Sequence, residues 1–209
     1  MSSRFVPAAV LAVLVASTVR AQPAPPEPPR LDVTGSVGWL ASDRQPASAL
    51  GSDPWLSRWT FDVGAGMHWT ENLITEIDVA HTSTGRVYLT QPVRQPGMET
   101  YIFSTDQVRD DRVGVRQLYQ FGRNAWVHPF VGAGIAVTRE WRQRSFQVFG
   151  PGTAPPPSEG TRVWVAPEFT GGVKFYVSPR VFIRTDATLA PTRTVVDATF
   201  RAGIGVDLR

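Results

Sequence analysis

Strict alternation of apolar and other residues is the feature of this 209-residue sequence that most restricts its fold. From Arg30 onward, apolar side chains recur at every second position, which places them on one face of an extended strand. The alternating segments span approximately residues 31–39, 59–69, 73–79, 113–121, 127–137, 163–175, 181–189 and 196–208. Neither a helical period nor a long apolar run is found there. The sequence therefore predicts an all-β protein with eight strands, enough to close a small barrel without exposed edges.

The N-terminal segment has the composition of an export signal. Residues 1–21 combine the positive charge of Arg4 with a short apolar stretch and a small residue at the end, as a signal peptide does. Residues 22–29 are proline-rich and predict an extended spacer, so the barrel domain is expected over residues 30–209. The net charge of +3 includes two arginines of the predicted signal, and no basic run predicts nucleic-acid binding. Because the chain has no cysteine, disulfides, thiol catalysis and cysteine-based zinc sites are excluded.

The second face of the predicted strands carries glycines and charges of both signs. Glycine covers nothing on a solvated strand, but it leaves room inside a narrow barrel. Buried charges must be paired, so we predict a charge network inside a plugged, non-porin lumen. Its members are Asp62, Glu76, Asp78, Arg112, Arg116, Glu168, Lys174, Arg184, Asp186 and Arg201, and Asp197 and Asp207 lie on the same face.

Connection lengths and aromatic positions favour a membrane barrel, with its apolar face toward lipid, over a soluble lipocalin-like barrel that binds a ligand inside. Long connections are expected at 43–57, 83–111 and 139–162, with short turns between them, as in outer-membrane barrels. This rhythm predicts a periplasmic N-terminus and extracellular long loops. Aromatic residues gather near both strand ends, as membrane-interface girdles require. They include Trp39, Trp59, Trp69, Tyr119, Phe121 and Phe175.

Two local patterns resemble the outer-membrane β-barrel superfamily that includes the OmpA-type transmembrane domain. The stretch 127–135 (VHPFVGAGI) is similar to a Pro-aromatic-x-Gly-x-Gly strand of such barrels. The C-terminal strand, with Gly203, Val206 and Leu208, resembles the signal read by the barrel assembly machinery, although the chain ends in Arg209 instead of an aromatic residue. The resemblance implies an eight-stranded antiparallel up-and-down transmembrane β-barrel in the outer membrane.

One short motif raises an enzymatic alternative. His81-Thr82-Ser83 resembles the His-x-Ser pair of small-barrel lipid A deacylases, which an acidic residue on a neighbouring strand completes, and Glu99 is the candidate here. The next residue is Thr84, where that family has asparagine, so the motif departs from the pattern. The three histidines show no metal-ligand spacing, and we predict neither a metal site nor a cofactor.

The partners expected from the sequence are those of a monomeric envelope protein. The expected loop at 139–162 begins with Arg139, Glu140, Arg142 and Arg144 and has a Pro/Gly-rich tip. Basic residues there suit lipopolysaccharide phosphates at the outer leaflet. We therefore expect outer-membrane lipid and lipopolysaccharide as partners, the assembly machinery during biogenesis, and a structural or surface-interaction role.

Overall fold

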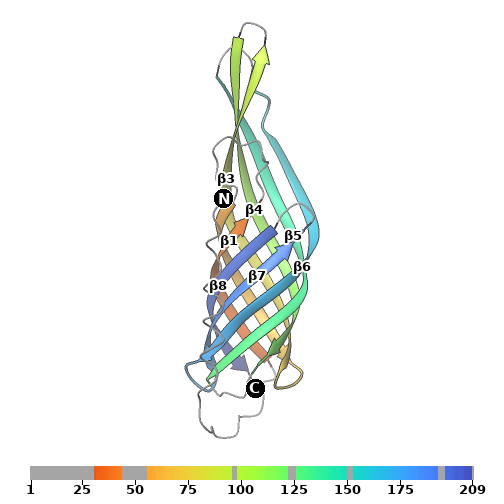
Figure 1. The fold of residues 1–209 in the computed structure, drawn as a ribbon, viewed down its shortest axis with the longest axis vertical. Coiled ribbons are helices and arrows are strands. Elements are labelled where there is room, and N and C mark those ends of the chain that lie inside the picture. The colour runs from red at the N-terminus through yellow and green to blue at the C-terminus, as the bar shows by residue number, and fades with distance from the viewer. Residues whose placement is uncertain are drawn as a thin grey trace, which may run out of the picture.

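The chain forms a closed antiparallel β-barrel, shown by a computed structural model that describes residues 31–43, 56–95, 98–121, 126–149, 153–192 and 196–208 (Figure 1). Each strand pairs with the next along the chain, and β1 pairs with β8 to close the barrel. The strands are β1 (Leu31–Ser42), β2 (Leu56–His68), β3 (Leu73–Gln95), β4 (Met98–Gln120), β5 (Val127–Phe149), β6 (Ser158–Tyr176), β7 (Val181–Pro191) and β8 (Val196–Leu208). The predicted fold class is confirmed.

Side chains alternate between the two faces of the wall as the sequence pattern predicts. The apolar set points outward, so that Val63 and Val165 each retain 62% exposure, while the alternate positions are buried in the interior. A lipocalin-like barrel would place its apolar face inside. The outward apolar face therefore excludes that alternative.

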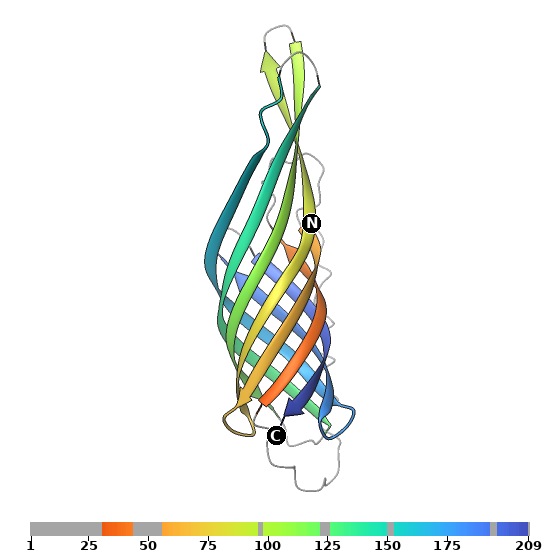
Figure 2. The same ribbon diagram turned by 180° about the vertical axis from the view of Figure 1, so that it is seen from behind.

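Four strands continue well past the rest of the barrel. β3, β4 and β5 are each 23 residues long and β6 is 19, whereas the other four strands have 11 to 13 residues. We call residues 85–95, 98–108, 139–149 and 158–163 the projection; it tapers away above the barrel in Figures 1 and 2. The opposite end, which carries the turns at 69–72 and 177–180, is the turn end.

The projection corrects the expected long loops at 83–111 and 139–162. These segments are mostly paired strands: Gly85 lies opposite Val108, and Arg144 lies opposite Ser158. Both faces mix polar and apolar residues: Asp106 and Val108 are buried, whereas Arg86 and Tyr88 are exposed. The hydrophobic period therefore fades although the backbone pairing persists. A bulge between Thr82 and Gly85 marks the change from barrel to projection.

The outer surface carries an apolar band with aromatic residues near both edges. Trp69, Tyr119, Phe121 and Phe175 are exposed near the turn end. Trp39 and Trp59 are exposed near the other edge, where their rings meet edge to face at 5.1 Å. Beyond Val79, Val113 and Val137 the outward positions become polar. These next positions are His81, Asp111 and Arg139, which are neighbours in register across β3, β4 and β5.

Several sequence predictions concern the chain ends. The predicted signal peptide at 1–21 and the spacer at 22–29 lie outside the described residues. Gly203, Val206 and Leu208 lie in β8, which pairs with β1 and β7. Within the described ranges, no helix has the length and apolar character needed to cross a membrane.

Candidate functional site: the charged interior of the barrel

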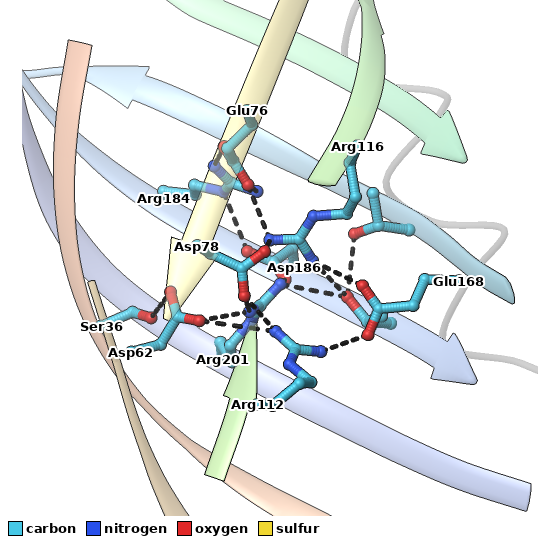
Figure 3. A network of polar contacts seen from close by, with 12 residues as sticks. Ser36, Asp62, Glu76, Asp78, Arg112, Arg116, Glu168, Arg184, Asp186 and Arg201 are labelled. Atoms are coloured by element: carbon cyan, nitrogen blue, oxygen red, sulfur yellow. Dashed lines mark hydrogen bonds and ion pairs between the residues drawn. The ribbon is translucent and has the colours of Figure 1, made fainter. Parts of the chain in front are cut away.

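Nine of the ten residues predicted as an interior charge network contact one another inside the barrel (Figure 3). They converge because residues two apart on a strand share a face, as Glu76 and Asp78 do on β3 and Arg112 and Arg116 do on β4. Asp62 comes from β2, Glu168 from β6, Arg184 and Asp186 from β7, and Arg201 from β8. Lys174 is the exception and pairs elsewhere.

Arg116 is a central cation of this network. Its Nη2 lies 2.7 Å from both Glu76 Oε1 and Asp78 Oδ1, and its Nη1 lies 3.9 Å from Glu168 Oε2. The side chain of Arg116 is 1% exposed, so these carboxylates replace water as the partners of its guanidinium. Such an arrangement is stable only while both signs are present, because an unpaired buried charge is costly.

Three further arginines link the remaining carboxylates. Arg112 bonds Asp78 and Glu168. Arg201 donates to Asp62 at 3.0 Å and to Asp186 at 2.7 Å. Arg184 donates to Asp186 at 2.9 Å and also bonds Glu76, which completes a connection from β8 through β7 to β3 and β4.

Glycine makes room for these long side chains. A Cβ on Gly114 would lie 2.7 Å from Asp78 Oδ1 and 3.2 Å from Glu168 Oε2. Both distances are shorter than ordinary packing, so a larger residue at 114 would displace the ion pairs. Gly114 thus leaves the space inside the barrel that glycine on the polar face is predicted to provide.

A second polar cluster occupies the turn end. Lys174 Nζ donates to Asp32 Oδ2 at 2.6 Å, and His68 Nε2 lies 2.9 Å from the same oxygen. Tyr176 donates from its hydroxyl to Asp207 at 2.9 Å. Asp207 is one of the residues predicted on the inner face, whereas Asp32 and His68 are not among the predicted members of the network. Asp32 lies between the outward-facing Leu31 and Val33, and His68 follows the outward-facing Met67. The alternation of the sequence therefore assigns both residues to the inner face as well.

Ion pairs also occur above the main network. Arg58 and Asp110 are both buried, and Arg58 Nη2 lies 2.5 Å from Asp110 Oδ2. In the projection, Arg144 donates to both oxygens of Asp106, at 2.6 and 2.7 Å. These hydrogen bonds raise the pKa of Arg144, which remains cationic. Between the network and the projection lies a cavity of about 40 Å³. Most of its lining residues are alanine and threonine, and the others are Leu40, Trp164 and the charged residues Asp110, Arg112, Glu168, Asp197 and Arg201.

The residues of the enzymatic alternative do not assemble as expected. His81 Nδ1 bonds Asp111 Oδ1 at 2.7 Å on the outer surface, so the acidic partner is Asp111. Glu99 lies opposite Arg94 in the projection, twelve residues along β4 from Asp111, and that part of the expectation is wrong. The Ser83 hydroxyl accepts a hydrogen bond from the Trp59 backbone N–H at 3.1 Å, next to the bulge that shifts Ser83 out of the regular register.

Comparisons with known proteins agree with the barrel architecture. A family model described as outer membrane protein beta-barrel domain matches residues 9–207. A sequence search of curated proteins finds no significant match. The fold resembles the crystal structure of Neisserial surface protein A, with 16% identity, a TM-score of 0.53 and coverage of 85% of this chain and 97% of that chain.

Two structures from Pseudomonas aeruginosa are also similar. The N-terminal β-barrel domain of OprF has 11% identity and a TM-score of 0.53, with coverage of 85% of this chain and 97% of that chain. OprG has 8% identity and a TM-score of 0.51, with coverage of 86% and 97%. At these identities the likeness concerns the fold alone.

Proposed function

The chain belongs to the outer-membrane protein β-barrel domain family, and on this premise we propose that it is a non-porin barrel with a structural and surface-interaction role. In this proposal the interior is closed by ion pairs, and the projection makes the contacts with other molecules. The observation that carries it is the network centred on Arg116 of β4, which connects carboxylates from β3 and β6 at one level of the lumen.

Two properties of the barrel support a closed lumen: the narrow width of its interior and the free-energy cost of separating its buried ion pairs. Eight strands enclose an interior just wide enough for side chains, and the cavity above the network has room for only a few water molecules. An ion that crosses this level must separate pairs such as Arg201–Asp186 and Arg112–Asp78. Removing a partner from such a buried pair costs about 3–5 kcal/mol, so spontaneous opening is rare.

Single-channel recording in a planar bilayer tests this closure. The wild-type barrel should give no stable, large conductance steps. Arg86→Ala, a change on the exposed part of β3, should behave like the wild type, and Arg112→Ala should increase the frequency of brief openings. A stable large conductance of the wild-type protein would contradict the closed-lumen proposal.

The proposed orientation places the turn end in the periplasm and the projection outside the cell, after removal of a signal peptide at 1–21. The short turns at one end of the barrel and the long projection at the other support this orientation, because outer-membrane barrels have short periplasmic turns and long extracellular segments. Because the chain has no cysteine, single-cysteine variants give a direct test with a membrane-impermeant maleimide. Arg86→Cys should react on intact cells, whereas Glu71→Cys in a turn should react only after lysis. The reverse pattern would overturn the orientation.

Lipopolysaccharide is the proposed partner at the outer edge of the apolar band. Supporting groups include exposed Arg139 in the polar row after the band and Arg109, whose guanidinium stacks 5.5 Å from the centre of the Trp141 ring. Cations beside aromatic rings at a membrane interface suit lipid phosphates. Arg139→Ala with Arg109→Ala should weaken co-purification of lipopolysaccharide. The matched control is Arg180→Ala in the turn at 177–180, and equal retention in both proteins would count against this contact.

A further inference from the structure

The turn end of the barrel holds an imidazole and two carboxylates outside the main charge network. We propose that Asp32, His68 and Asp207 form a binding site for one divalent transition-metal ion. One potential ligand atom from each of the three side chains lies within 4.8 Å of the others. The three residues come from β1, β2 and β8, and the closure of the barrel brings them together.

The strand register explains how the three side chains converge. Asp32 lies directly opposite Asp207 on one side and Gly66 on the other. A Cβ on Gly66 would fall 2.6 Å from Asp32 Oδ1, so glycine leaves the space that this carboxylate occupies. His68, two residues after Gly66 on the same face, then reaches Asp32 diagonally at 2.9 Å.

Two carboxylate oxygens of the cluster have no hydrogen-bond partner. Asp32 is 1% exposed and Asp207 is 6% exposed, yet Oδ1 of each is buried and unpaired among the described residues. A buried polar atom without a partner carries a desolvation cost, and an ion is one of the ordinary explanations for it. A cation between the two oxygens would satisfy both atoms.

The charge balance of the interior points to a cation as well. Within the described part of the barrel, the main network and the turn-end cluster contain seven carboxylates and five cationic side chains. The carboxylates belong to Asp32, Asp62, Glu76, Asp78, Glu168, Asp186 and Asp207, and the cations to Arg112, Arg116, Lys174, Arg184 and Arg201. With His68 neutral, two negative charges are uncompensated, which a divalent ion would balance.

The donor set selects the class of metal. An imidazole nitrogen with two carboxylate oxygens suits Zn²⁺ and related first-row ions, whereas calcium and magnesium prefer oxygen ligands alone. Asp32 Oδ2 accepts the hydrogen bond from Lys174, and Asp32 Oδ1 remains available for the metal. His68 would bind through Nε2 as a neutral imidazole with its proton on Nδ1, so binding releases a proton wherever the ring begins protonated.

Isothermal titration calorimetry, in which Zn²⁺ is added to the folded barrel in detergent, tests the site. The wild type should bind one Zn²⁺ per chain. His68→Ala and Asp207→Asn should each reduce the affinity at least tenfold. His81→Ala is the matched control, because it removes an exposed histidine far from the cluster, and it should leave the affinity unchanged. Asp207→Asn is preferable to Asp32→Asn, since Asp32 also pairs with Lys174.

A second measurement on the wild-type chain does not depend on variants of the cluster. The protein has only three histidines, so zinc should shift one set of imidazole ¹⁵N signals, and His81→Ala and His128→Ala should identify it as that of His68 by elimination. A folded wild-type barrel that binds no zinc, unchanged affinity in both His68→Ala and Asp207→Asn, or a zinc-dependent shift at His81 or His128 alone would overturn the proposal.

Discussion

Replacing Arg116 with methionine should destabilise the barrel far more than an equivalent change on the exposed face of the projection. The side chain is 1% exposed and contacts Glu76 and Asp78 at 2.7 Å each. Methionine keeps most of the volume but removes the charge, so these carboxylates lose a cationic partner in a site with little water. Breaking a buried pair in this way costs about 3–5 kcal/mol, which is more than a hundredfold in the unfolding equilibrium.

Reversible urea unfolding in lipid vesicles measures this cost through the midpoint and slope of the transition. Arg86→Met, an equivalent change on the exposed face of the projection, should stay within about 0.5 kcal/mol of the wild type. Adding Glu76→Gln to Arg116→Met should cost less than the sum of the single changes, because the two residues share one interaction. A loss below about 1 kcal/mol for Arg116→Met, or strict additivity with Glu76→Gln, would refute the reasoning.

Two further predictions use the same unfolding assay. Gly114→Val should destabilise the barrel by about 1–3 kcal/mol through overpacking against Asp78 and Glu168, whereas Gly35→Val, whose Cβ would meet nothing within 4 Å, should be nearly neutral; equal effects would contradict the assignment of the two faces. Val115→Lys on the outward apolar band should cost about 2–4 kcal/mol in a bilayer, whereas Tyr88→Lys on the projection should change the stability little. Similar losses for both lysines would place the band elsewhere.

The eight strands of the barrel were predictable because membrane-exposed strands must present apolar side chains to lipid at every second position. The same rule explains where prediction failed. Beyond His81 and Arg139 polar and apolar side chains are mixed on both faces, so the alternation no longer distinguishes a strand from a loop, and the sequence pattern predicts loops where the structure has the projection. Backbone hydrogen bonds hold β3 to β6 together there, and these bonds leave no pattern in the side-chain types.

The candidate site divides in the same way. Alternation alone assigned charged residues such as Glu76, Asp78 and Arg116 to the inner face, since that assignment needs only the period of a strand. It could not identify which opposite charges meet, because the pairing depends on the register and stagger of strands that are distant in sequence. The acidic residue beside His81 shows the difference: the resemblance to the His-x-Ser motif implies an acidic residue on a neighbouring strand, for which Glu99 is the candidate, whereas the register of β3 with β4 places Asp111 there.

The sequence by itself thus determined the strand period, the faces and the location of the apolar band, all of which are local properties of the chain. Only the tertiary structure decided what barrel closure brings together. Asp32 and Asp207 lie near opposite ends of the described chain, and they become neighbours because β1 pairs with β8. His68 joins them across Gly66, so the cluster at the turn end exists only in the closed barrel.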